Sequence, residues 1–386
     1  MRELPQTAQV VIIGGGVMGA STAYHLAVRG CRDVLLLERQ PFFGHGATGK
    51  CAGGIRYQFS TAINIRLSQL SLPMLDQFEE EISQAIGLRY DGYLLLATNE
   101  DVVQTFRRNV ALQHSLGVST EWLDGDEVRR QVPQLAADDV IAATFHSRDG
   151  LADPHGVVAG YINAARRLGV KALTDTPVTG IEISGGQVSA VQTPFGKVNC
   201  EFVINAAGPW SGAVAEMAGV SLPIIPVRRQ MLTTTALPEL APDFPFVIDF
   251  ARSLYFHREG AGLLTGMSNP DQAPGFDESV DENWELVHLE AAAERLPLLQ
   301  NAGLVARWAG LYEVTPDAHP IIGRMPEPEG FVVVTGFSGH GFMHGPIAGL
   351  LTAEIILDGQ AHTLDISSLA YERFAESRLS REFNVI

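Results

Sequence analysis

Short apolar runs recur along the chain and predict buried strands. Residues 10–13, 34–37, 202–205 and 331–335 are each dominated by Val, Ile, Leu or Phe. Runs this short and continuous are typical of parallel strands that are buried on both faces. Residues 17–29, with helical spacing of small and apolar side chains, separate the first two runs. The chain is therefore expected to begin with a β-α-β unit.

The rest of the chain alternates expected helices with strands that Pro and Gly separate. Strands are expected at residues 93–97, 141–146, 170–198, 202–205, 305–312 and in three stretches of 227–266. Helices are expected at residues 63–86, 100–116, 155–168, 282–295 and 347–357. The pattern begins as α/β, twice gives way to antiparallel strands, and twice returns.

The return of the α/β pattern predicts two interleaved domains in a fold that is α/β with α+β elements. A nucleotide-binding domain is expected from residues 1–86, 151–215 and 320–386. A substrate-binding domain with a mostly antiparallel sheet is expected from residues 87–150 and 216–319. The 386 residues are enough for two such cores.

A glycine-rich loop joins the first expected strand to the first expected helix. Residues 14–19 read GGGVMG, the GxGxxG fingerprint of dinucleotide binding. In that motif Gly14 permits the tight turn, Gly16 lets the backbone approach the pyrophosphate, and Gly19 lets helix and strand pack closely. Glu38 follows about 20 residues later, where an acid can accept hydrogen bonds from the ribose hydroxyls. Such an acid suits NAD as well as FAD.

Two further segments of small residues follow later strands. Residues 205–210 read NAAGPW, and residues 335–342 read TGFSGHGF before an expected helix. Small residues let a backbone pass close to a cofactor. The helix amino terminus would stabilise negative charge, such as that of a reduced flavin. The alternative is that both are ordinary glycine-rich turns, with His340 as a capped surface residue.

Composition and charge exclude several classes of function. The net charge of −17 argues against nucleic-acid binding, which needs clustered Lys and Arg. Three cysteines without a CxxC pair argue against a disulfide framework and a zinc site, so no metal is expected. Residues 330–353 contain no Asp, Glu, Lys or Arg, but their glycines, Pro346, His340 and His344 favour a strand, a turn and a helix over a membrane span. A soluble, cytoplasmic protein is expected.

Five segments together resemble the D-amino-acid oxidase and sarcosine oxidase superfamily of FAD enzymes. They occur in the family's order over nearly the whole chain, at residues 14–19, 44–56, 205–210, 308–317 and 336–342. The likeness is greatest to the sarcosine oxidase and L-proline dehydrogenase β subunits. Residues 53–60 (GGIRYQFS) are also similar to a flavoprotein that assists respiratory complex I assembly.

The resemblance implies an FAD domain of the p-hydroxybenzoate hydroxylase type and a substrate domain whose sheet faces the flavin. It implies hydride transfer from a C–H bond next to nitrogen onto flavin N5, after which the imine is hydrolysed. The cofactor-binding residues carried over from the family pattern are Gly14, Gly16, Val17, Met18, Gly19, Glu38, Arg39, Thr48, Lys50, Cys51, Val178, Ala206, Ala207, Gly208, Trp210, Gly310, Gly339, His340, Gly341, Phe342 and Met343.

Three positions depart from the monomeric sarcosine oxidases that the chain resembles. Gly310 stands where those enzymes attach the flavin through a cysteine, so FAD is expected to be non-covalent. Leu264 aligns with the lysine that activates oxygen, and Met343 with a lysine that helps hold the substrate carboxylate. The loss of a fixed cation beside the flavin should slow the reaction with oxygen, which favours a dehydrogenase over an oxidase.

Five residues are the expected catalytic group: Arg56, Tyr255, Arg258, Tyr312 and His340. Arg56 aligns with the carboxylate-binding arginine of the family, and a bidentate pair would orient the substrate. Tyr255 and Arg258 lie on the strand expected to face the flavin, and Tyr312 takes the place of an arginine in glycine oxidases. The alternatives are a structural ion pair for Arg56 and packing or surface roles for the others.

The expected activity is oxidation of the C–N bond of an amine or amino acid. Sarcosine, dimethylglycine, proline, glycine and D-amino acids all remain open as substrates. A heteromeric partner subunit or a separate electron acceptor would fit the β-subunit likeness, as would a second flavin at a subunit interface. One alternative is an FAD-binding assembly or scaffold subunit without catalysis. Another is an NAD-dependent dehydrogenase, which would be colourless.

Overall fold

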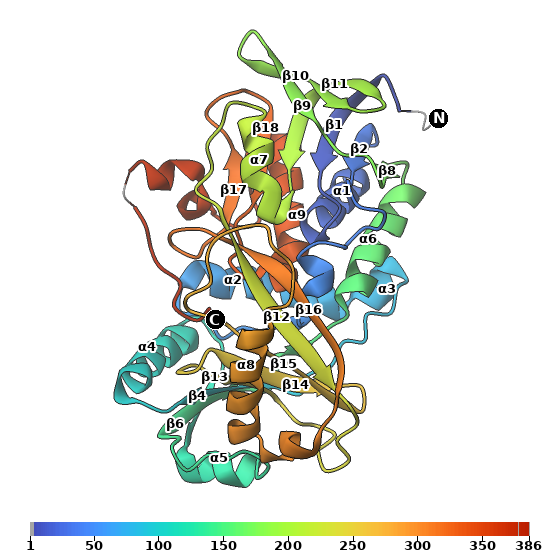
Figure 1. Ribbon diagram of the computed structural model, residues 1–386. Coiled ribbons are helices and arrows are strands. Elements are labelled where there is room, and N and C mark those ends of the chain that lie inside the picture. The colour runs from blue at the N-terminus through green and yellow to red at the C-terminus, as the bar shows by residue number, and fades with distance from the viewer. Residues whose placement is uncertain (1–3, 377, 386) are drawn as a thin grey trace.

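Two eight-stranded sheets and one small two-stranded sheet form the described part of the protein, and Figure 1 shows the two large sheets one above the other. The structure is a computed structural model that describes residues 4–376 and 378–385. Residues 1–3, 377 and 386, which fall within the expected domain ranges, lie outside the described residues. The long strands β12 (Ile225–Thr234) and β16 (Leu304–Val314) run from the lower sheet towards the upper one (Figure 1).

The upper sheet has the parallel core that the apolar runs predict. Its strands β18, β11, β1, β2 and β8 are parallel neighbours in this order, with Ile12 level with both Ile204 and Leu36. Antiparallel strands β17, β10 and β9 extend it. The bounds are β1 (Thr7–Ile13), β2 (Val34–Leu37), β8 (Lys171–Leu173), β9 (Gly180–Ser184), β10 (Gln187–Thr193), β11 (Gly196–Asn205), β17 (Ile321–Arg324) and β18 (Phe331–Thr335).

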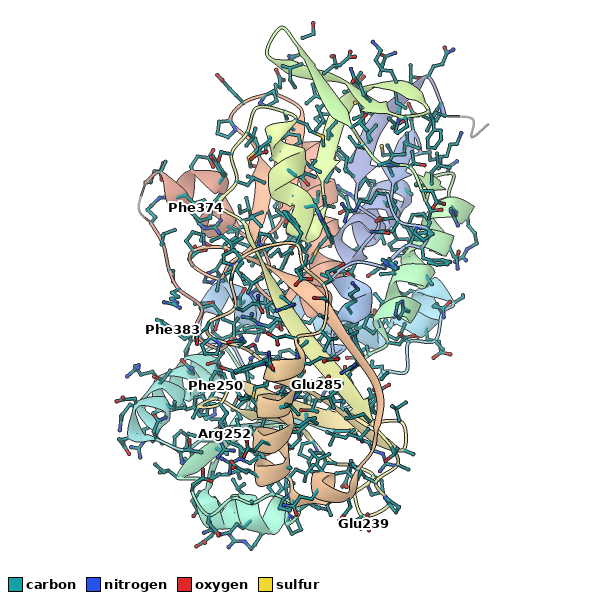
Figure 2. The ribbon with its side chains drawn as sticks, viewed as in Figure 1. Glu239, Phe250, Arg252, Glu285, Phe374 and Phe383 are labelled. Carbon is teal, nitrogen blue, oxygen red and sulfur yellow. The ribbon has the colours of Figure 1, made fainter. Side chains whose placement is uncertain are left out.

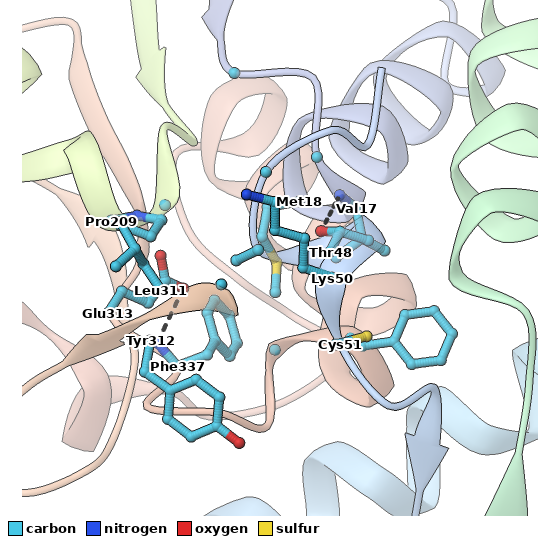
Figure 3. Close-up of a pocket in the computed structure, with 18 of the residues that line it drawn as sticks. Val17, Met18, Thr48, Lys50, Cys51, Pro209, Leu311, Tyr312, Glu313 and Phe337 are labelled. Atoms are coloured by element: carbon cyan, nitrogen blue, oxygen red, sulfur yellow. Dashed lines mark hydrogen bonds between the residues drawn. The ribbon is translucent and has the colours of Figure 1, made fainter. Parts of the chain in front are cut away.

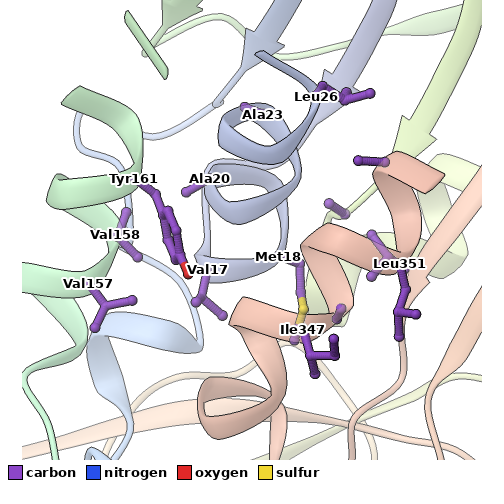
Figure 4. Packing of buried hydrophobic residues seen from close by; sticks show 14 of the residues in the cluster. Val17, Met18, Ala20, Ala23, Leu26, Val157, Val158, Tyr161, Ile347 and Leu351 are labelled. Carbon is purple, nitrogen blue, oxygen red and sulfur yellow. The ribbon is translucent and has the colours of Figure 1, made fainter. Parts of the chain in front are cut away.

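Three helices pack together on one face of this sheet. Helix α1 (Val17–Val28) lies between α6 (Pro154–Arg167) and α9 (Gly341–Asp358), and apolar side chains of all three interdigitate (Figure 4). Helix α9 begins at Gly341, six residues before the expected start. The expected start was wrong because glycines before residue 347 allow close helix packing and do not only form a turn. A Cβ at Gly345 would lie 2.4 Å from Val17 Cγ2.

The lower sheet is mostly antiparallel, as expected. Its order is β16-β12-β15-β14-β13-β4-β6-β5, and only the β13–β4 pair is parallel within the described sheet. Four strands, not three stretches, occupy residues 225–267. The remaining bounds are β4 (Tyr93–Ala97), β5 (Glu121–Asp124), β6 (Ala142–His146), β13 (Phe246–Asp249), β14 (Leu254–Glu259) and β15 (Gly262–Met267). The strands of each sheet fall within the ranges expected for its domain, and the exact boundaries stay a prediction.

Helices cover both faces of the lower sheet. Helices α5 and α8 share one apolar cluster with it, and α4 shares the other. Arg252 lies outside this core and pairs with Glu294 of α8 at 2.9 Å; Figure 2 shows its position. The bounds are α4 (Glu100–Ser115), α5 (Gly125–Gln131) and α8 (Glu282–Arg295).

The single helix expected at residues 63–86 is the second helix that the structure corrects. Residues 63–86 form two helices, α2 (Ala62–Asp76) and α3 (Phe78–Ile82), because Gln77 leaves the helical conformation at ψ 1°. The remaining strands, β3 (Gly54–Ile55) and β7 (Gly150–Leu151), pair with each other, and the remaining α-helix is α7 (Ser211–Glu216). Among the described residues, no helix has the length and apolar character needed to cross a membrane.

Candidate active site

A cavity of about 320 Å³ lies between the two sheets, within the usual size of small-molecule sites. Loops at the carboxyl ends of β1, β2, β11 and β18 form one part of its wall, and strands β12, β14 and β16 form another. Figure 3 shows Thr48, Lys50 and Cys51 on one side and Leu311, Tyr312 and Glu313 on the other. The site thus combines residues from both sheets.

Most of the expected site residues line this cavity. Of the expected cofactor-binding residues all except Gly19 do so, as do four of the five expected catalytic residues. A Cβ at Gly19 would lie 1.9 Å from Gly14 O, so Gly19 allows the helix to pack on the turn without reaching the cavity. This is the packing role expected of Gly19 in the fingerprint, and Gly19 differs from the other expected cofactor-binding residues in not lining the cavity.

Arg258 is the expected catalytic residue that the structure places elsewhere. Its guanidinium donates hydrogen bonds to the carbonyls of Gly260, Leu240 and Ala241. Tyr255 and Arg258 are three residues apart on β14, and alternation along a strand points such side chains to opposite faces. Since Tyr255 faces the cavity, Arg258 faces away from it, and the expectation for Arg258 was wrong.

The loop after β1 has the geometry that a dinucleotide pyrophosphate requires. A Cβ at Gly14 would lie 2.3 Å from Ala206 O, and Gly14 has φ 111°, so neither the space nor the conformation suits a larger residue. Val17 N–H donates to Thr48 Oγ1 at 3.2 Å (Figure 3). The first turn of α1, all of it described, contains no acidic residue that would repel a phosphate.

Glu38 is positioned by the same loop. It directly follows β2, and its carboxylate accepts hydrogen bonds from Gly15 N–H at 2.7 Å and Gln40 N–H at 2.8 Å. The carboxylate therefore lies at the cavity wall with a fixed orientation, where ribose hydroxyls could donate to its remaining lone pairs. Nearby, the Arg39 guanidinium lies 3.8 Å from the centre of the Trp210 ring. These contacts fit the adenosine half of a dinucleotide.

Three tyrosines line the part of the cavity that faces the lower sheet. Each ring lies against a glycine, at a distance that a Cβ would not allow. The pairs are Tyr93 with Gly54, Tyr255 with Gly266, and Tyr312 with Gly339. Burial raises the pKa of all three phenols. They are therefore neutral hydrogen-bonding groups at physiological pH.

Arg56 is a buried cation in this part of the cavity. Only 6% of its surface is exposed, and burial lowers its pKa, an effect that the phenol of Tyr93 and the carboxylates of Glu382 and Asp149 oppose. Its guanidinium donates to Gln58 O at 2.6 Å and to Asn384 O, both of which are neutral carbonyls. Among the described residues it forms no ion pair with a carboxylate. The structural ion pair weighed as an alternative is therefore absent from this part of the chain.

The carboxyl-terminal segment is a part of the site that the sequence did not predict. Asn384 supplies a carbonyl to Arg56, and Val385 lines the cavity. Glu382 anchors the segment because its buried carboxylate accepts a hydrogen bond from Ser60 N–H at 2.8 Å. No local motif marks these residues, so only their tertiary contacts could have found them.

His340 lies at the start of α9 and is engaged through both ring nitrogens. Nε2 lies 3.0 Å from Ala318 O, and Nδ1 lies 3.2 Å from His344 Nδ1. His344 Nε2 lies 3.0 Å from Ser68 Oγ, which donates to the Arg56 carbonyl. Burial lowers the pKa of His340 to about 4. At neutral pH its uncharged ring belongs to a chain that supports Arg56.

Two ionisable residues of the cavity wall were missed in the sequence in addition to Tyr93. Arg229 of β12 lines the cavity, and its guanidinium lies 5.1 Å from the Tyr312 ring centre. Glu313 of β16 also lines it, accepting hydrogen bonds from Phe337 N–H and Thr335 Oγ1, each at 3.2 Å. Burial raises the pKa of Glu313 to about 7. Alternation along β12 was the available signal for Arg229, but it gave none for Glu313, which follows Tyr312 directly on β16 although both line the cavity.

Lys50 and Cys51 lie at the cavity wall next to β16. Lys50 Nζ pairs with Glu278 Oε1 at 2.8 Å, so its charge is compensated. A Cβ at Gly310 would lie 3.0 Å from Lys50 Cβ. All three cysteines of the chain are described and free, and burial raises the pKa of Cys51 to about 11. Its thiol is therefore a weak nucleophile at neutral pH.

Comparisons with known proteins agree with this geometry. The family model described as FAD dependent oxidoreductase matches residues 9–355. Mitochondrial dimethylglycine dehydrogenase of Rattus norvegicus is 30% identical over 378 residues, which cover 93% of this chain and 44% of that protein. FAD-dependent oxidoreductase domain-containing protein 1 of Xenopus laevis is 32% identical over 436 residues, which cover 99% of this chain and 85% of that protein.

A solved structure shows the same fold. L-proline dehydrogenase from P. horikoshii is 32% identical and superposes with a TM-score of 0.91, covering 97% of this chain and all of that one. This chain spans less than half the length of the rat dimethylglycine dehydrogenase. The fingerprint loop, Glu38 and the small residues after β11 fit FAD. The chain therefore belongs to the family of FAD-dependent oxidoreductases, and FAD is its cofactor.

Proposed function

We propose that the protein is a dehydrogenase that oxidises the C–N bond of an N-substituted amino acid. The observation that carries this proposal is the buried Arg56 guanidinium, which lines the cavity and has no carboxylate partner among the described residues. A buried charge is costly unless it is paired. The carboxylate of an amino acid would supply the missing partner through the donors that the two carbonyls leave free.

We choose N-substituted amino acids as the substrate class because two relatives are named for such substrates. Dimethylglycine and L-proline, on which those relatives act by name, are both amino acids with an alkylated nitrogen. When bound, FAD supplies the acceptor for a hydride. Arg56 would hold the substrate carboxylate and so fix the position of the carbon next to nitrogen. The aromatic rings of Tyr93, Tyr255 and Tyr312 would exclude water around it.

The surroundings support a flavin that is bound without a covalent link. Gly310 offers no side chain, and Cys51, the cysteine that lines the cavity, has a raised pKa. Leu264 is buried beside Tyr255 and Met231, where a lysine would have provided a cation for oxygen activation. We therefore include non-covalent FAD and slow reaction with oxygen in the proposal.

The test is to mix the FAD-loaded protein anaerobically with sarcosine, dimethylglycine, L-proline, glycine and D-amino acids and to follow the yellow colour of oxidised flavin. We expect the N-substituted amino acids to bleach the flavin and air to restore the colour slowly. Rapid recolouring in air would indicate an oxidase. Failure of every compound to bleach a fully loaded protein would overturn the proposal and favour the assembly or scaffold role.

The variant Arg56→Met tests the residue itself. We expect substrate binding to weaken about ten- to hundredfold, as for a lost hydrogen bond to a charged group. The matched control is Arg66→Met, because Arg66 is an exposed arginine of the neighbouring helix α2. Unchanged affinity in the Arg56 variant would remove Arg56 from the site.

A further inference from the structure

Arg229 differs from its neighbour Arg228 because the two side chains point to opposite faces of β12. Arg228 points away from the cavity and pairs with Asp277 at 2.8 Å and Asp281 at 3.5 Å. Arg229 shares the cavity-facing side of the strand with Met231. It lies opposite Gly310 in the β12–β16 register, and the ring centre of Tyr312, also on β16, lies 5.1 Å from its guanidinium.

The guanidinium of Arg229 has few partners. One of its nitrogens donates to Arg228 O at 3.0 Å, and the Nε atom is buried without a hydrogen-bond partner. Burial lowers the pKa of Arg229, and only the phenols of Tyr312 and Tyr255 oppose this effect. Among residues 4–376 and 378–385, no carboxylate pairs with it. Arg229 therefore has no counter-charge among the described residues, whereas the carboxylates of Glu382 and Asp149 raise the pKa of Arg56.

Arg56 and Arg229 act on one region of the cavity. Both lower the pKa of the Tyr312 phenol, which shows that this side chain lies within the electrostatic reach of each guanidinium. The acid nearest in sequence, Glu313, is held by Phe337 N–H and Thr335 Oγ1 and does not pair with either arginine. A ligand beside Tyr312 would meet two cations and neutral phenols.

We propose that Arg229 binds a second carboxylate, so that the preferred substrate is a secondary amine that carries two carboxylates. One carboxylate would be bound by Arg56 and the other by Arg229, with the nitrogen between them. Two anions compensate two buried cations, whereas an amino acid with one carboxylate leaves Arg229 unpaired. This inference rests on the proposed function because it assigns Arg56 to the first carboxylate.

Binding of unreactive analogues tests the inference without turnover. Diglycolate has an ether oxygen between two carboxylates, and methoxyacetate is the same molecule with one carboxylate replaced by hydrogen. Calorimetry on the FAD-loaded protein should show tighter binding of diglycolate. In Arg229→Met, the ratio of the two dissociation constants should change by about tenfold or more in favour of methoxyacetate, the effect of one lost charged hydrogen bond.

Two further variants keep the test decisive. Arg228→Met removes the outward-facing neighbour and should leave the ratio unchanged. Arg229→Lys retains the charge and should keep part of the preference, even if the methionine variant folds poorly. An unchanged ratio in both Arg229 variants, or an equal change in the Arg228 variant, would overturn the assignment.

A reactive pair separates this inference from the proposed function. Iminodiacetate and sarcosine differ by one carboxylate, and iminodiacetate should bleach the flavin at the lower concentration. If neither bleaches it while diglycolate is still preferred through Arg229, the proposed function fails and the second anion site stands. If sarcosine bleaches the flavin and diglycolate shows no preference, the second site fails and the proposed function stands.

Discussion

The arginines of the cavity wall and those of the interior have different environments. Arg295, 2% exposed, pairs with Asp249 at 2.8 Å, and Arg373, 1% exposed, pairs with Asp317 at 2.8 Å. Arg56 and Arg229 instead contact backbone carbonyls, and no carboxylate pairs with them among the described residues. A paired buried charge is explained by the fold, whereas an unpaired one beside a cavity calls for a ligand.

The largest effect should come from breaking an interior pair. Arg295→Met leaves the fully buried Asp249 without its main partner and should lower the free energy of unfolding by about 3–5 kcal/mol. Arg148→Met is the control, because Arg148 is 59% exposed and its pair with Asp76 lies at the surface, worth at most about 1 kcal/mol. Urea unfolding measures both, and equal losses would contradict the distinction.

A smaller change in stability should distinguish the arginines of the cavity wall from those of the interior when a ligand binds. A carboxylate ligand at 100 times its dissociation constant should stabilise the folded protein by about 2.7 kcal/mol. We expect Arg295→Met to keep this increment, since its site is intact, and Arg56→Met to lose most of it. The measurement is the shift in melting temperature with and without methoxyacetate. Loss of the shift in both variants would show that Arg295 also supports the cavity.

The last effect concerns Glu313, a buried acid of the cavity wall. Its pKa of about 7 in the folded protein lies above the ordinary 4.5, so between these pH values the folded state binds a proton that the unfolded state has lost. Its contribution to stability is complete below pH 4.5 and is lost as pH rises through 7. Glu313→Gln should therefore gain in melting temperature relative to the original protein between pH 5 and pH 8. A constant difference would show that Glu313 is ionised throughout.

Local motifs were enough to predict the dinucleotide end of the site. The turn at Gly14, the close backbone approach at Gly16 and the acid at Glu38 all lie within one β-α-β unit, whose geometry is nearly independent of the rest of the fold. The same reasoning failed at Gly341, where α9 begins early. There the role of the glycines depends on contact with Val17 and Ser21 of α1, far away in the sequence.

The substrate end was predicted only in part. Arg56 was found through a family likeness, and Tyr255 and Tyr312 were placed correctly at the cavity wall. Arg258 was misplaced because the alternation along β14 was not applied to it. Arg229 was missed, although alternation along β12 separates it from Arg228. Alternation assigns residues to two faces, but it does not say which face borders the cavity.

The sequence by itself determined the parallel strands, the fingerprint loop and the acidic residue after β2, because these depend on residues close together in the chain. Only the tertiary structure decided which charges lack partners. Arg56 meets Asn384 from the far end of the chain, and Arg229 faces Tyr312 from a neighbouring strand. Whether a buried guanidinium is neutralised depends on contacts across the whole fold, and no local pattern of residues records them.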